Sequence, residues 1–328
     1  MFRNPRVWTA TLVTLVLGSL VVLKLLGEGY SGLPLVAGLF PLFCIGWLFF
    51  LVAFADPVQG IQKFTAPAPW RILLLPAGLT TLWLIYAVGT DGFALNKLTI
   101  FIGYVFVPTL CLLMAGRDSR PGPWDFIFLM VLWIPVDAGW LQSVWDWPAG
   151  AGRNVYSIPM ACALALILIL TFRRIPDPQF RFRLRRSDLK PVLFNLGLFL
   201  AIGIPAGLLT GFIAWNPKPW DPAGLLLSCL LTFLLVAAPE ELFFRGIMQG
   251  YVTKILGKPR FSLILVSLIF GLAHLNNTDP YFDWRYIILA SIAGFLYGLT
   301  YEKTNNLTPA MLVHTGVDVI WINFFYIN

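Results

Sequence analysis

The chain has 328 residues, of which 58% are hydrophobic, 15% aromatic and only 12% charged, and its formal net charge is +7. Soluble globular domains carry roughly 25% charged residues. The composition therefore excludes a water-soluble globular protein, an intrinsically disordered chain and a nucleic-acid-binding protein that acts through a basic surface. The cysteines lie inside apolar runs without metal-site or redox spacing, and we interpret them as buried hydrophobic residues: Cys44, Cys111, Cys162 and Cys229.

Long apolar runs follow one another along the chain. Because a spanning helix needs about 20 mainly apolar residues, they predict an all-α, polytopic transmembrane helix bundle with ten or eleven spans. We interpret the first run as a spanning helix rather than a removed signal peptide. The run 125–143 is the weakest, because Pro135 and Asp137 interrupt it, and 223–252 is longer than one crossing needs. The candidate spans are 7–26, 33–55, 71–89, 98–116, 125–143, 155–172, 191–215, 223–252, 261–276, 285–302 and 308–326.

Basic residues between the spans set the expected orientation. By the positive-inside rule, Arg3 and Arg6 place the N-terminus in the cytoplasm. Segment 173–190 is the most basic stretch and is expected to be a cytoplasmic linker between an N-terminal block of about six helices, 1–172, and a C-terminal block, 191–328. We expect a multi-pass integral membrane protein, in the plasma membrane if the source is bacterial. The basic residues of the linker are Arg173, Arg174, Arg181, Arg183, Arg185, Arg186 and Lys190.

Three apolar spans of the C-terminal block contain groups that a membrane helix rarely carries. A charge at the bilayer centre costs at least about 2.5–3.5 kcal/mol on insertion scales, so ionisable residues in spans are functional candidates. The chain has only two histidines, and both lie in these spans. The segments are APEELFFRG with Glu240, Glu241 and Arg245, IFGLAHLNN with Phe270 and His274, and LTPAMLVHTGVD with His314 and Asp318.

Helical spacing predicts which of these groups meet. Glu241 and Arg245 are four residues apart, so they share a helix face and can pair. Glu240 is rotated from Glu241 by about 100° and has no local partner. His314 and Asp318 lie one turn apart on one face. Glu240 is therefore the carboxylate that remains available for chemistry.

The depths of these groups in their helices agree only in part. Glu240 and His274 each lie 14 residues, about 21 Å of helix, from the turn at Lys254–Arg260. In the last span, Thr308 and Pro309 resemble an N-cap and a first helical residue. His314 would then lie only about 10 Å into its helix. The helices must be tilted, staggered or locally broken for all three groups to meet.

A carboxylate with two imidazoles in a cleft of low polarity can activate water and stabilise an oxyanion. Taken alone, Glu240 is as compatible with a structural carboxylate bonded to a neighbouring helix, and each histidine by itself favours a hydrogen-bonded structural role in the core. A membrane transporter or carrier and a non-catalytic membrane scaffold or immunity protein are the alternative functions. We find no internal repeat, which argues against the common inverted-repeat transporter folds.

The three motifs in this order resemble those of the CPBP family of intramembrane proteases, which includes the type II CAAX prenyl endopeptidase and bacteriocin-processing or immunity-associated (ABI-like) relatives. The family pattern EExxxR, FxxxH and HxxxN or HxxxD is matched from Glu240 to Arg245, from Phe270 to His274 and from His314 to Asp318. The resemblance covers roughly residues 190–328.

The resemblance implies an intramembrane endopeptidase that hydrolyses a peptide bond of a membrane-bound or lipidated substrate. Glu240 would activate water with the help of His274, and His314 and Asp318 would line the oxyanion side. Glu241, Arg245 and Phe270 would support them. Many members have Asn at the position of Asp318, and an ionised Asp318 would repel an oxyanion unless it is protonated or acts by orienting His314.

Metal use is a separate question. Glu240, His274 and His314 could hold zinc and leave one coordination position open. The HExxH spacing of many zinc peptidases is absent. The family has long been named as metalloproteases, but the structural view of it implies a glutamic-type peptidase that uses a water molecule without a cofactor, and we expect the same of this chain. Zinc stays the alternative.

Overall fold

The structure is a computed structural model that describes residues 5–53, 56–116, 121–148, 156–173, 184–275, 277 and 282–327. Arg3 and the linker residues Arg174, Arg181 and Arg183 lie outside the described residues. The chain divides into two compact units, Met1–Asp177 and Pro178–Asn328. Helices dominate both units, so the predicted all-α, polytopic bundle is confirmed. The functional assignment of the two predicted blocks stays a prediction.

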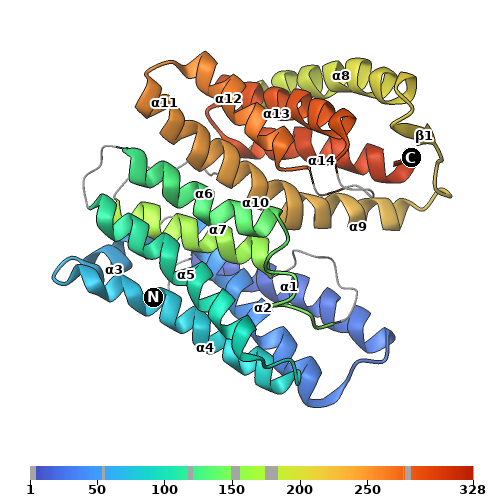
Figure 1. Cartoon of the computed structure of the whole chain (residues 1–328). Helices are drawn as coiled ribbons and strands as arrows, with labels where there is room; N and C mark the ends of the chain where they lie inside the picture. The colour runs from blue at the N-terminus through green and yellow to red at the C-terminus, as the bar shows by residue number, and fades with distance from the viewer. Residues whose placement is uncertain are drawn as a thin grey trace. The chain divides into compact units, whose positions relative to one another are not determined.

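The first unit is built around helix α2, which packs against α1, α4 and α7, while α5 packs between α4 and α6 (Figure 1). Helix α3 is a short amphipathic helix that the sequence analysis did not predict. The elements of this unit are α1 (Pro5–Gly27), α2 (Gly32–Ala53), α3 (Asp56–Thr65), η1 (Pro69–Leu73), α4 (Leu74–Gly89), α5 (Leu95–Ala115), α6 (Pro123–Asp137), α7 (Ser157–Ile167) and η2 (Leu168–Phe172).

A buried ion pair ties the end of the first unit together. The Arg173 guanidinium donates to both carboxylate oxygens of Asp125, at 2.7 and 2.8 Å. It also donates to the carbonyl oxygens of Ala115 and Gly116, at 3.1 and 2.7 Å. Both charged side chains are almost completely buried. Arg173 therefore joins α5, α6 and η2 and does not belong to an exposed basic surface.

In the second unit, α13 is the central helix and packs against α12, α8 and α14 (Figure 1). Residues 222–256 form one long helix, in which two π-helical stretches, η3 and η4, flank a single α-helical turn, α10. The elements are α8 (Arg186–Leu209), β1 (Ile213–Trp215), α9 (Pro222–Thr232), η3 (Phe233–Ala237), α10 (Ala238–Glu241), η4 (Leu242–Gln249), α11 (Gly250–Leu256), α12 (Pro259–Leu272), α13 (Trp284–Thr304), α14 (Leu307–Phe324) and β2 (Phe325–Ile327).

Local sequence explains where these helices begin and end. Proline occupies the first helical position of α9 and α12, where its missing N–H costs nothing. Asn305 adopts a left-handed conformation and ends α13, and the Asn306 side chain then caps α14 by accepting from the Thr308 backbone N–H at 3.3 Å. The predicted cap at Thr308 was therefore wrong by two residues, because Asn306 supplies the capping oxygen.

A short antiparallel ribbon also lies outside the sequence prediction. Strand β1 pairs with β2, and Ile213 faces Ile327 in the register. Ile213 and Phe325 of the ribbon are buried with Phe212 and Leu289 in one cluster, against which Tyr286 and Trp321 pack. The ribbon thus fixes the end of α14 against the start of α13.

Six helices in the described part of the chain are long and apolar enough to cross a membrane. Two shorter apolar stretches, Ser157–Phe172 and Pro259–Leu272, fall below that length. Length and composition therefore support a multi-pass integral membrane protein. The total of ten or eleven spans and the cytoplasmic N-terminus stay predictions.

Candidate active site

The polar groups of the second unit come from three elements. The long helix 222–256 carries Glu240 and Glu241 on α10 and Arg245 on η4. Helix α12 carries Phe270, and His274 follows two residues after its last residue. Helix α14 carries His314 and Asp318. The π-helical stretches are a rare backbone form that is frequent at functional sites.

Glu241 and Arg245 form the inner part of the site. Arg245 Nε lies 3.4 Å from Glu241 Oε2, and both side chains are fully buried. Arg245 also donates to the carbonyl oxygen of Gly294 on α13 at 3.0 Å, and its guanidinium lies 4.6 Å from the centre of the Phe270 ring. The predicted pair is confirmed, and it connects the long helix to α12 and α13.

His314 is held between carboxylates. Its Nδ1 lies 3.0 Å from Glu241 Oε1, and since an ionised carboxylate only accepts, Nδ1 carries the proton of this hydrogen bond. Its Nε2 lies 3.4 Å from Asp318 Oδ2 and 3.9 Å from Glu240 Oε2. The ring stacks on Tyr297 at 4.5 Å between centroids. Both the position and the orientation of this imidazole are therefore fixed.

His274 is oriented by its own helix. Its Nδ1 lies 2.8 Å from the carbonyl oxygen of Phe270. A carbonyl oxygen only accepts, so Nδ1 is the protonated nitrogen, and in the neutral ring Nε2 is an acceptor. The His274 ring packs against Phe270 at 4.8 Å and Tyr286 at 5.1 Å between centroids. His274 thus has one nitrogen available for a water molecule or a substrate.

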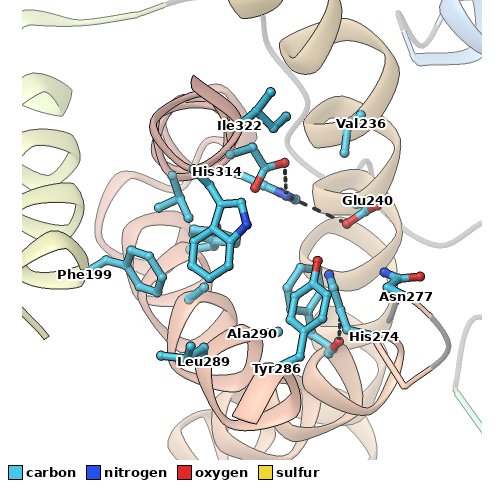
Figure 2. A pocket seen from close by; sticks show the side chains of 16 residues that line it. Phe199, Val236, Glu240, His274, Asn277, Tyr286, Leu289, Ala290, His314 and Ile322 are labelled. Atoms are coloured by element: carbon cyan, nitrogen blue, oxygen red, sulfur yellow. Dashed lines mark hydrogen bonds and ion pairs between the residues drawn. The ribbon is translucent and has the colours of Figure 1, made fainter. Parts of the chain in front are cut away.

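These side chains border one pocket of about 210 Å³ (Figure 2). The exposed fraction of the side chain increases from 0% at Glu241 and 3% at His314 to 14% at Glu240 and 28% at Asp318. Glu240 and Asp318 are therefore the carboxylates that a water molecule in the pocket can reach. The polar lining residues are Glu240, His274, Asn277, Tyr286, Tyr297, His314, Asp318 and Trp321, and the apolar ones include Phe199, Val236, Leu289, Ala293, Val317 and Ile322.

The donors do not form a metal-binding group as they stand. In the parts of the chain that the structure describes, no three or more His, Cys, Asp or Glu side chains are gathered so that they could hold a metal ion. His314 has Nδ1 engaged by Glu241, and its Nε2 faces two carboxylates. Both ring nitrogens of His314 therefore face carboxylates in this arrangement. Independence from metal stays a prediction that chelation tests.

The structure brings the predicted site residues together. Glu240, His274, His314, Asp318 and Phe270 line the pocket. Glu241 and Arg245 lie behind them, fully buried. Their catalytic roles stay predictions.

Sequence analysis missed Asn277, Tyr286, Tyr297 and Trp321, which also line the pocket. Tyrosine and tryptophan are common at membrane interfaces. Nothing in the sequence context of Tyr286, Tyr297 and Trp321 distinguishes these three residues from such anchors.

Comparison with known proteins bears on this part of the chain. Residues 222–320 match the model of a family described as type II CAAX prenyl endopeptidase Rce1-like. The predicted resemblance is confirmed over this segment, and it supports an intramembrane CAAX-type endopeptidase in general terms. The uncharacterized protein YpbD of Bacillus subtilis (strain 168) is 33% identical over 88 residues, which cover 27% of this chain and 40% of that relative. No solved structure matches the chain significantly.

Proposed function

We propose that the protein is an intramembrane endopeptidase that hydrolyses a peptide bond of a membrane-bound or lipidated substrate with a water molecule activated by Glu240. The observation that carries the proposal is the convergence of Glu240, His274, His314 and Asp318 on one solvent-accessible pocket inside a helix bundle. The match of residues 222–320 to a CAAX-type endopeptidase family supports the reaction class.

In the proposed mechanism, Glu240 takes a proton from a water molecule whose second hydrogen is held by the unprotonated nitrogen of His274. The oxygen of that water attacks the carbonyl carbon of the scissile bond and forms a tetrahedral intermediate. Glu240 then returns the proton to the amine nitrogen, and the carbon–nitrogen bond breaks. A positioned general base contributes typically 10²–10⁴-fold to such a reaction.

The buried groups act as positioning residues. Glu241 fixes the tautomer and orientation of His314 through the 3.0 Å contact to Nδ1. Arg245 balances the charge of Glu241. Arg245 is itself held in place because its guanidinium donates to the carbonyl oxygen of Gly294. Asp318 and His314 lie 3.4 Å apart, so Asp318 acts by orienting the imidazole next to Glu240.

The pocket suggests the kind of substrate. Apolar side chains that include Phe199, Val236 and Ile322 line the pocket on several sides (Figure 2). This apolar lining favours a scissile bond next to an apolar side chain or a lipid group, because burying apolar surface contributes about 25 cal/mol per Å².

A comparison of membrane proteomes tests the proposal. Cells that produce the wild type should process the C-terminus of at least one membrane-bound protein, and cells with Glu240→Gln should accumulate the unprocessed form. Glu28→Gln is the matched control, because Glu28 is a half-exposed glutamate in the first unit and its partner is Lys24. Identical sets of termini in all three strains would contradict the proposal, and gradient-driven solute flux instead would favour a carrier.

A further inference from the structure

Hydrolysis places negative charge on the oxygen of the scissile carbonyl, and proteases stabilise it with hydrogen-bond donors. Two groups that border the pocket, Glu240 and Asp318, are carboxylates and only accept when ionised. The carbonyl oxygen must therefore face another part of the lining.

Both imidazoles are engaged with other groups in the structure. The Nδ1 proton of His274 is used by the carbonyl oxygen of Phe270, which leaves an acceptor on the pocket side. The Nε2 atom of His314 lies between Asp318 at 3.4 Å and Glu240 at 3.9 Å. Once Glu240 has taken the proton of the water molecule it is neutral, but a carbonyl oxygen that approached this nitrogen would still meet the Asp318 carboxylate, whose charge opposes the developing oxyanion.

Tyr286 offers a further donor that carries no charge. It lies in the first turn of α13 and lines the same pocket, and its ring packs against His274 at 5.1 Å between centroids. Figure 2 shows the ring beside His274 with its hydroxyl directed toward the side where Glu240 and His314 lie. The Asn277 side chain, which also lines the pocket, hydrogen-bonds to this hydroxyl. A phenol both donates and accepts, and it carries no charge at neutral pH.

The surroundings of Tyr286 hold it in place. Its ring also packs on Phe212 at 5.4 Å between centroids, in the cluster beneath the β1–β2 ribbon. The turn that carries it is capped by Asp283, whose carboxylate accepts from the Arg285 backbone N–H at 2.8 Å. Preorganised donors of this kind do not need to reorient during the reaction.

We propose that the Tyr286 hydroxyl donates a hydrogen bond to the oxyanion of the tetrahedral intermediate. The proposal rests on the endopeptidase function above and makes Tyr286 a catalytic residue of that reaction. The other tyrosine at the pocket, Tyr297, has a different role, because its ring stacks on His314 at 4.5 Å and only 1% of the residue is exposed.

The test compares purified Tyr286→Phe with the wild type on an internally quenched peptide that spans the cleavage site found in the membrane proteome. The variant keeps the ring and its packing on His274. We expect kcat to fall about 10²-fold, the loss typical of one missing oxyanion donor. We expect KM to change less than about twofold, because the interaction forms only in the transition state.

Tyr301→Phe is the matched control, since it removes a hydroxyl from the same helix 15 residues away, a distance of about 22 Å. Tyr301 does not line the pocket, and this variant should keep the wild-type kcat. A peptide phosphonate, which mimics the tetrahedral anion, supplies a second readout. Its inhibition constant should weaken for Tyr286→Phe by about the same factor as kcat.

The outcomes separate the two proposals. Wild-type kcat in Tyr286→Phe, or a lower kcat with unchanged phosphonate inhibition, would overturn the role of Tyr286. If Glu240→Gln cleaves the peptide as fast as the wild type, the endopeptidase mechanism itself fails. If Glu240→Gln is inactive while Tyr286→Phe is fully active, only the oxyanion proposal fails.

Discussion

Adjacent glutamates on the long helix have different environments, because successive helical residues point about 100° apart. Glu241 is fully buried and contacts Arg245 and His314. Glu240 is 14% exposed and borders the pocket. One helical turn thus supplies both a structural carboxylate and a carboxylate that water reaches, which is the division of roles that the proposed mechanism needs.

Replacement of Arg245 by Met should destabilise the protein strongly. It leaves the Glu241 carboxylate buried without its cation, and breaking a buried pair in this way costs about 3–5 kcal/mol. The double variant Glu241→Gln with Arg245→Met should recover part of this loss, since no unpaired charge is left. Unfolding of the purified protein in detergent measures the effect.

Arg260→Met is the control for this measurement, because Arg260 is exposed at the start of α12. Its free energy of unfolding should stay within about 0.5 kcal/mol of the wild type. Equal stability of Arg245→Met and Arg260→Met would show that the buried pair does not support the fold.

Close packing of α12 against α13 depends on Gly271. A Cβ atom added there would overlap the Ser291 hydroxyl and approach the carbonyl oxygen of Ile287. Gly271→Ala should therefore cost about 1–3 kcal/mol, as overpacking does in other cores, and should lower activity because α12 positions His274.

Gly197→Ala is its matched control, because an added Cβ at this position in α8 meets nothing within 4 Å. Alanine should stabilise that helix by about 0.5–1 kcal/mol. Unfolding of both variants in detergent, with peptide cleavage assayed in parallel, measures the two effects. A stable and fully active Gly271→Ala would contradict the packing shown by the structure.

The cap of α13 gives stability that depends on pH. The Arg285 side chain hydrogen-bonds to Asp283, with Nε at 2.9 Å from Oδ1, and lowers the pKa of that carboxyl group. A carboxyl group with a lowered pKa in the folded state contributes stability above its ordinary value of about 3.9. This contribution is lost as the pH falls through the lowered value.

Asp283→Asn keeps a capping oxygen but cannot ionise. The difference in melting temperature between wild type and Asp283→Asn should therefore be constant near neutral pH and should shrink as the pH falls below about 4. Thermal unfolding in detergent across this range measures the difference. A difference that grows in acid would show that the Asp283 carboxylate is not favoured by its neighbours.

At the scale of the whole molecule, hydropathy in the sequence was enough to predict the long helices, such as 222–256 and 284–304, because a bilayer requires continuous apolar runs. It did not predict α3 or the β1–β2 ribbon, which are short and depend on tertiary packing. Four-residue spacing predicted the contact of Glu241 with Arg245, since the contact lies within one helix.

Contacts between distant helices were harder to predict. His314 meets Glu241 across 73 residues of sequence, and helix lengths alone suggested that His314 lies two turns away from the other groups. The packing of α14 against α9, η3 and α10, which sequence spacing does not encode, brings them together. The position of Tyr286 beside His274 likewise depends on how α13 packs against α12.

The proposed activation of water by Glu240 leads to a prediction about metal use. Strict chelation with EDTA or phenanthroline should leave peptide cleavage unchanged, while a zinc peptidase treated in parallel should lose its activity. Loss of cleavage that zinc alone restores would assign Glu240, His274 and His314 to a metal site instead.

Peptide hydrolysis in oxygen-18 water by purified wild type and Glu240→Gln is the most direct test of a carboxylate that activates water inside the bundle. The wild type should place one heavy oxygen in the new C-terminal carboxylate. Glu240→Gln should remain folded and be at least about 10²-fold slower. Cleavage by Glu240→Gln at the wild-type rate, with the same label incorporated, would show that another group activates the water.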